Sequence, residues 1–182
     1  MKIPQIIPQK IYDIPGLQHQ IRRWRLLGKT VAFTNGCFDI LHQGHIASLS
    51  DAAREADFLV VGLNSDASTR RLKGDQRPVN NQDARATLLA SLLMVDAVII
   101  FDEDTPLELI KAVEPDVLVK GGDYTLDQIV GAKEVIAAGG RVVINPILPG
   151  FSTTGIIEKI IDRKSTRLNS SHSRRSRMPS SA

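Results

Sequence analysis

Continuous apolar runs of strand length alternate with segments of helical periodicity along most of the chain, and this alternation limits the fold more than any other feature. Runs rich in Val, Ile and Leu are typical of strands that a parallel sheet buries on both faces. Strands joined through helices pair in parallel by right-handed crossovers. We therefore predict an α/β protein with a doubly wound, parallel, five-stranded sheet and helices on both faces. The predicted strands are residues 31–33, 58–63, 97–101, 116–119 and 142–144.

The segments between these strands divide into helices and one long polar loop, residues 64–81. Ahead of the first strand, Leu17, Ile21, Trp24 and Leu27 recur at helical spacing. Residues 1–28 should therefore contain a lead-in helix that packs on the sheet edge or on a second subunit. The other predicted helices are residues 46–56, 82–95, 106–113, 126–138 and 154–161, the last capped by Ser152 or Thr153.

Two histidines follow the first predicted strand, at the point where the next helix begins. Asn35-Gly36 is a turn signal, and His42 and His45 lie three residues apart in the first helical turn, so both side chains can point the same way. Backbone N–H groups without intrahelical partners and the positive end of the helix dipole lie beside them. Helix starts of this kind bind phosphate, and doubly wound sheets bind ligands at the same strand ends. We therefore predict a phosphate-binding site here.

Residues 34–45 read TNGCFDILHQGH and resemble the signature of the nucleotidyltransferase superfamily that contains cytidylyltransferases and small adenylyltransferases. Four more segments resemble its heptose 1-phosphate adenylyltransferase branch, without the kinase domain usually fused to it. The resemblance covers residues 29–161 and implies a Rossmann-like nucleotidyltransferase domain over that range. The four segments are NSDASTRRLKG at 64–74, RPV at 77–79, VKGGDY at 119–124 and FSTT at 151–154.

The resemblance implies a cytoplasmic enzyme that transfers AMP from ATP to D-glycero-β-D-manno-heptose 1-phosphate, giving ADP-heptose and pyrophosphate for lipopolysaccharide core synthesis. Its expected partners are ATP and a sugar 1-phosphate, with a separate heptose 7-phosphate kinase in the same pathway, and a homodimer through residues 1–27 stays open. No serine or cysteine has an obvious base and orienter, so the residues themselves favour direct displacement without a covalent intermediate.

The resemblance also implies residue roles. His42, His45 and Lys73 would be catalytic, the histidines on the α- and β-phosphates and the lysine between the α-phosphate and the incoming phosphate. Lys73 as a solvated loop lysine and Arg85 as an exposed helix residue remain alternatives. Nucleotide-binding roles fall to Thr34, Asn35, Gly36, Cys37, Phe38, Gly44, Lys120, Gly122, Asp123, Ser152, Thr153 and Thr154, and substrate-binding roles to Asp39, Arg77, Arg85 and Tyr124.

Two other functions stay open. One is a cytidylyltransferase acting on glycerol 3-phosphate or another polyol phosphate. Wider cytidylyltransferases tend to carry an arginine where this chain has Ile147-Leu148-Pro149, which counts against that function. The other is a non-catalytic nucleotide-binding protein, against which the intact histidines and Lys73 argue.

Magnesium is the expected cofactor, held chiefly by phosphate oxygens and water, as suits a hard octahedral ion. Asp39 is the nearest carboxylate, but it can equally cap its loop, so the protein ligands of the metal stay unassigned. His42 and His45 lack the third ligand that a zinc site requires.

The net charge of +3 at pH 7 is concentrated at the C-terminus. Residues 162–182 hold six basic residues and one acidic residue, which leaves 17 basic against 19 acidic residues in the rest of the chain. This slightly acidic body argues against a nucleic-acid partner. Residues 162–182 lack apolar periodicity and are predicted to be disordered. Part of the segment back-translates onto a common sequencing-library adapter, so we interpret it as read-through beyond a natural end near Ile161.

No apolar run approaches the roughly 20 residues of a membrane helix, and the N-terminus does not resemble a secretory signal. We therefore expect no membrane partner. The single cysteine, Cys37, excludes an internal disulfide and fits a reducing cytoplasm.

Overall fold

The computed structural model describes residues 4–146 and 148–163 of the chain. The chain divides into two units, residues 1–149 and residues 150–182. The first unit holds the sheet, and the described part of the second holds one helix, residues 153–163.

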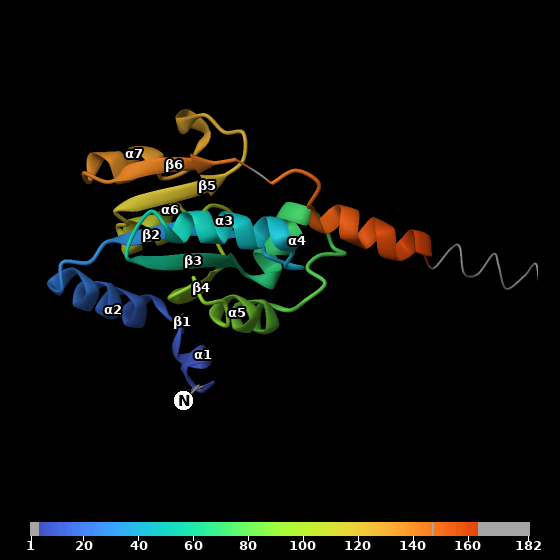
Figure 1. The fold of residues 1–182 in the computed structure, drawn as a ribbon, viewed down its shortest axis with the longest axis horizontal. Coiled ribbons are helices and arrows are strands. Elements are labelled where there is room, and N and C mark those ends of the chain that lie inside the picture. The colour runs from blue at the N-terminus through green and yellow to red at the C-terminus, as the bar shows by residue number, and fades with distance from the viewer. Residues whose placement is uncertain (1–3, 147, 164–182) are drawn as a thin grey trace, which may run out of the picture. The chain divides into compact units, whose positions relative to one another are not determined.

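The sheet is parallel throughout and has the strand order β1-β4-β3-β2-β5-β6 (Figure 1). This confirms the predicted doubly wound α/β fold, with one more strand than predicted. The additional strand, β1, has only two residues and pairs with β4 at the sheet edge, too short to give an apolar run. The strands are β1 (Ile11–Tyr12), β2 (Val31–Gly36), β3 (Phe58–Asn64), β4 (Ala97–Phe101), β5 (Val117–Gly121) and β6 (Arg141–Asn145).

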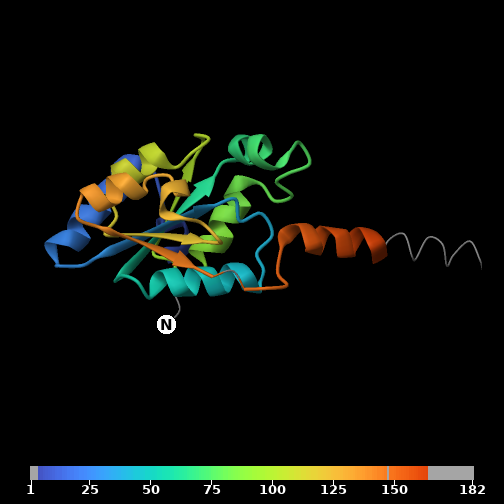
Figure 2. The same ribbon diagram turned by 90° about the horizontal axis from the view of Figure 1, so that it is seen from above.

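Helices cover both faces of the sheet, as predicted. Alternate residues of β2 show this: Val31 and Phe33 join one buried cluster, whereas Ala32 joins the other. Helices α2, α6 and α7 pack on the first face and α3 and α5 on the second; Figure 2 shows α3 and α7 on opposite sides of the sheet. The helices are α1 (Ile6–Gln9), α2 (Ile14–Leu26), α3 (Gln43–Ala53), α4 (Asp66–Lys73), α5 (Gln82–Ala90), α6 (Leu107–Val113) and α7 (Ala132–Ala137), with a 3-10 turn η1 (Leu126–Gln128).

Helix α4 lies where the sequence predicted a polar loop, so that part of the prediction is wrong. The helix starts where the Ser65 side chain accepts a hydrogen bond from the Ser68 N–H group, at 2.9 Å. Its buried residues are Ser68 and Thr69, so it lacks the apolar stripe by which an amphipathic helix is recognised. The single helix predicted over residues 126–138 is also wrong, because η1 and α7 are separated at Gly131, which has a φ of 85°.

Helix α2 is the lead-in helix. Leu17, Ile21 and Trp24 are buried, and Trp24 stacks on Phe58 with ring centroids 4.2 Å apart. Leu27, which the periodicity placed with them, lies just past the helix and is 75% exposed. The helix therefore packs on the sheet through three of the four predicted residues.

The order of the strands reverses between β2 and β5. The chain runs from β2 through β3 to β4 on one side and then crosses to β5 and β6 on the other. The carboxyl ends of β2 and β5 therefore border the crevice where folds of this class bind ligands.

In the second unit, the Gly155 N–H group donates to Ser152 Oγ at 3.0 Å, so Ser152 caps the helix as predicted. That helix continues through Arg163, two residues beyond its predicted end at Ile161. The rest of the predicted disordered tail, residues 164–182, lies outside the described residues. Across residues 4–146 and 148–163, none of the helices is both long and apolar enough to cross a bilayer.

Candidate active site

The two histidines of the motif stack at the start of α3. His42 is the N-cap residue, and its Nδ1 accepts a hydrogen bond from the His45 N–H group at 3.3 Å. The two rings lie 3.8 Å apart between centroids, with 17° between their planes, and the Phe38 ring meets His45 edge-on at 5.3 Å. Because Nδ1 of a neutral His42 accepts a bond, its proton sits on Nε2. His42 is therefore a hydrogen-bond donor beside the helix N-terminus, with the His45 ring stacked on it.

Both imidazoles are held neutral at pH 7. Burial lowers the pKa of His45 to about 4, helped by the neighbouring charge of His42, while a backbone hydrogen bond to Ile40 acts in the opposite direction. Burial also lowers the pKa of His42. A neutral His42 can thus bind an anion by donating a hydrogen bond from Nε2 without carrying a charge of its own.

Lowering the pH from about 7 to about 4.5 should reduce the free energy of unfolding through His45. Its pKa is about 4 in the folded chain against an ordinary value of 6.5, so the unfolded chain takes up the proton first as the pH falls. Above 6.5 both states are neutral; between 6.5 and 4 the folded state loses stability. Denaturant unfolding of the wild type and of His45→Asn at both pH values checks this. Equal losses in the two proteins would contradict it.

The ammonium group of Lys120, a residue of β5, lies at the same strand ends. Its Nζ donates to Asn35 Oδ1 on β2 at 3.4 Å and lies 5.9 Å from the centroid of the Tyr124 ring. Burial lowers the pKa of Lys120, as does the charge of Lys73, whereas Cys37 raises it. Lys73 is the exposed last residue of α4, and its charge repels the ammonium group of Lys120. A bound phosphate would stabilise both charges.

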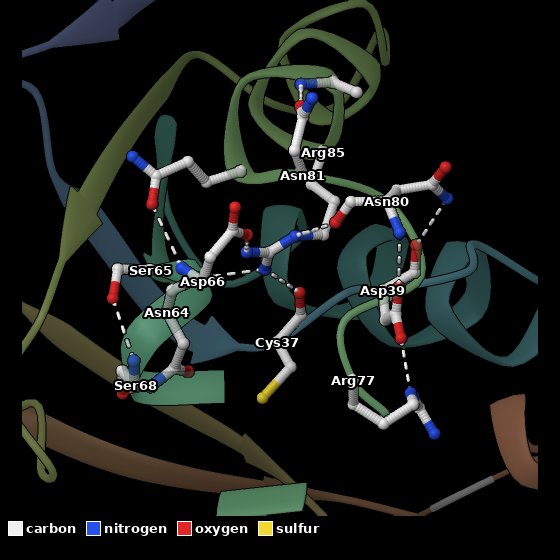
Figure 3. A network of polar contacts seen from close by, with 12 residues as sticks. Cys37, Asp39, Asn64, Ser65, Asp66, Ser68, Arg77, Asn80, Asn81 and Arg85 are labelled. Atoms are coloured by element: carbon white, nitrogen blue, oxygen red, sulfur yellow. Dashed lines mark hydrogen bonds and ion pairs between the residues drawn. The ribbon is translucent and has the colours of Figure 1, made fainter. Parts of the chain in front are cut away.

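The buried Asp39 side chain connects the loop after β2 to residues 77–80. Its side chain is 1% exposed and accepts hydrogen bonds from Arg77 Nε at 2.5 Å and from the Val79 and Asn80 N–H groups at 2.7 and 3.1 Å (Figure 3). Both carboxylate oxygens are thus engaged by protein donors, which fits the loop-capping role better than a metal-binding one. Within residues 4–146 and 148–163, no group of three or more His, Cys, Asp or Glu could hold a metal ion.

Arg85 is fully buried, so its interpretation as an exposed helix residue is wrong. Its guanidinium donates to the carbonyls of Cys37, Asn64 and Asn80 at 2.6, 2.9 and 3.0 Å, and to Asp66 Oδ1 at 2.7 Å (Figure 3). These donors point at protein groups and not at a substrate. One sequence signal could have indicated burial, because Arg85 lies four residues before the buried Leu89 on the same helical face.

Glycine is favoured at two points around these loops. A Cβ on Gly36 would lie 3.0 Å from the Phe38 ring, so the glycine leaves room for that ring to pack against the loop. Gly122 has a φ of 132°, which other residues rarely adopt. The expected nucleotide-binding residues of this unit all follow β2 or β5 or lie at their ends: Thr34, Asn35, Gly36, Cys37, Phe38, Gly44, Lys120, Gly122 and Asp123.

Ser152, Thr153 and Thr154 belong to the second unit, residues 150–182. In that unit they lie at the start of the helix, which Ser152 caps. Sequence reasoning missed three residues of the first unit that support the site, Asn64, Asp66 and Asn80. Only their contacts with Arg85 and Asp39, which join distant segments, mark them as support.

The chain matches known proteins over most of its length. A family model described as cytidylyltransferase-like matches residues 33–159. The bifunctional protein HldE of Rhodopseudomonas palustris (strain HaA2) is 59% identical over 143 residues, which cover 79% of this chain and 29% of HldE. HldE of Mesorhizobium japonicum is 56% identical over 150 residues, 82% of this chain and 30% of HldE. The chain thus spans under a third of the length of these relatives.

Solved structures share the fold. The lipopolysaccharide core biosynthesis protein from Thermoplasma volcanium GSS1 is 31% identical, with a TM-score of 0.54 and coverage of 66% of this chain and 98% of that one. Pantoate-β-alanine ligase from Francisella tularensis, 18% identical, has a TM-score of 0.53 and coverage of 75% and 66%, and shows similarity of fold alone. Together with the family match, these relatives confirm the resemblance inferred from the histidine motif.

Proposed function

Since this chain is a nucleotidyltransferase of the cytidylyltransferase-like family, we propose that it transfers AMP from ATP to D-glycero-β-D-manno-heptose 1-phosphate. The observation that carries the proposal is the stacked pair His42 and His45 at the start of α3, beside the point where the strand order reverses. Two neutral imidazoles and a helix N-terminus suit the α- and β-phosphates of a nucleoside triphosphate.

In the proposed reaction, a phosphate oxygen of the acceptor attacks the α-phosphorus of ATP. The bond between the α-phosphorus and the oxygen that bridges it to the β-phosphorus breaks, and pyrophosphate leaves with the electron pair of that bond. The acceptor phosphate is already ionised, so no general base is needed, and catalysis depends on in-line positioning and on stabilising the charge of the equatorial oxygens. His42 and His45 donate to those oxygens, while Lys73 and Lys120 offset the charge.

The sugar is inferred from relatives. Bifunctional HldE proteins are 54–59% identical to this chain, and the related Thermoplasma volcanium protein is described by its part in lipopolysaccharide core biosynthesis. These similarities support a heptose phosphate acceptor and ADP-heptose as the product. We assign Arg77, oriented by Asp39, to the acceptor phosphate and Tyr124 to the acceptor sugar.

Magnesium fits this proposal as an ion carried in by ATP. Because the Asp39 oxygens are already engaged, phosphate oxygens and water would be its main ligands. When bound, the ion would neutralise phosphate charge, and the histidines and lysines would still orient the reacting groups. We place the reaction in the cytoplasm, in a pathway that also includes a heptose 7-phosphate kinase, and we propose that the chain acts as a homodimer.

The test follows pyrophosphate release from purified protein given ATP or CTP together with heptose 1-phosphate or glycerol 3-phosphate. We expect release only with ATP and the heptose phosphate. Pyrophosphate release with CTP but not with ATP would favour the cytidylyltransferase alternative. Binding of ATP without turnover on any sugar phosphate would instead indicate a non-catalytic nucleotide-binding protein.

A further inference from the structure

We infer that Arg85 is a positioning residue, which fixes the direction of Arg77 through Asn80 and Asp39 and so controls binding of the acceptor phosphate. The inference rests on the proposed function. It concerns how residues 77–80, which carry Arg77, are held in place.

The first step is the set of bonds that Arg85 makes. Its guanidinium joins three segments of the chain: the loop after β2 at Cys37, the β3–α4 junction at Asn64 and Asp66, and the loop before α5 at Asn80 (Figure 3). The side chain is fully buried, so its charge is balanced within the protein, chiefly by Asp66. A planar group with five donors can serve all these acceptors at once, which a lysine ammonium cannot.

The second step runs from Asn80 to Arg77. Besides its backbone N–H group, Asn80 donates through Nδ2 to the Asp39 carbonyl at 2.9 Å. The Asp39 carboxylate in turn holds Arg77 by Nε, the contact drawn as a dashed line in Figure 3. The Arg77 side chain is 16% exposed, so its direction is set by this contact more than by solvent.

Arg85 and Arg77 are therefore connected by a series of contacts that begins at the buried Arg85 and ends at Arg77. Arg77 Nε is held by Asp39, and Asp39 is held by two hydrogen bonds from Asn80 and one from Val79. Loosening Arg85 should therefore release residues 77–80 and misdirect Arg77, while the imidazole pair on α3 keeps its own bond between His42 and His45.

A double-mutant cycle tests the inference. Arg85→Lys should raise the KM for the sugar phosphate about tenfold and leave the KM for ATP within about twofold. In an Arg77→Ala background, Arg85→Lys should change the acceptor KM by less than about twofold, because the residue through which it acts is gone. Arg141→Lys, at an exposed ion pair with Glu55, is the matched control and should leave both constants unchanged.

A second measurement does not depend on turnover. Amide hydrogen exchange at Val79 and Asn80, whose N–H groups donate to Asp39, should become about tenfold faster in Arg85→Lys, with no change at Val98 in the sheet. If Arg85→Lys does not fold, Asn80→Ala, which removes only the bond from Nδ2, should raise the acceptor KM in the same direction.

Three outcomes would overturn the inference: unchanged exchange at Val79 and Asn80, equal increases in both KM values, or full additivity with Arg77→Ala. If the wild type turned over no substrate, the proposed function would fail by itself. The exchange measurement would then still decide whether Arg85 holds residues 77–80.

Discussion

Replacing His45 by alanine is expected to lower the turnover number by about a hundredfold or more, the usual loss when one charge-stabilising donor is removed from an active site. His45 lies 3.8 Å from His42 between ring centroids and is positioned by the first turn of α3, so alanine at this position removes one ring of the stacked pair. The effect should appear in kcat for pyrophosphate release, more than in the KM for ATP.

The matched control is His19→Ala, an exposed histidine on α2, which should leave kcat unchanged. A thermal unfolding curve for each variant separates loss of chemistry from loss of structure, because His45 also contacts the Phe38 ring. Near-normal turnover of His45→Ala would show that this imidazole is not a catalytic group. A hundredfold loss with unchanged unfolding temperature would support the assignment.

Replacing Arg85 by leucine is expected to lower the free energy of unfolding by about 3–5 kcal/mol, the range measured when one partner of a buried ion pair is removed. The leucine fills much of the space, but it leaves the carbonyls of Cys37, Asn64 and Asn80 without their donor and Asp66 without its counter-charge. Each buried acceptor without a partner adds to the loss. Small domains are stable by about 5–15 kcal/mol, so much of the total would be lost.

Urea or guanidinium unfolding at pH 7 measures this loss, with Arg141→Leu as the control. Arg141 also pairs with a carboxylate, Glu55, at 2.8 Å, but its side chain is 54% exposed. The exposed pair should contribute at most about 1 kcal/mol. Similar losses in the two variants would mean that the buried contacts of Arg85 stabilise the fold no more than a surface pair does.

The sheet could be predicted because its strands are buried on both faces. Residues 58–63 and 97–101 are continuous apolar runs, and the structure places β3 and β4 there within one residue of the prediction. The same signal was absent for β1, which has two residues, and for α4, whose buried face is formed by Ser68 and Thr69. Apolar periodicity detects elements that bury apolar surface, so elements held by polar contacts were missed.

The sequence by itself determined the doubly wound arrangement and the position of His42 and His45 at a helix start, because both follow from local patterns of apolar residues and turn signals. Only the tertiary structure decided that Asp39 and Arg85 face protein groups and that Lys120 reaches Asn35. Each of these contacts joins segments 38 to 85 residues apart. A local pattern reports which face of a helix or strand a residue occupies, but the partner of a buried charge comes from whichever distant segment the fold places against it.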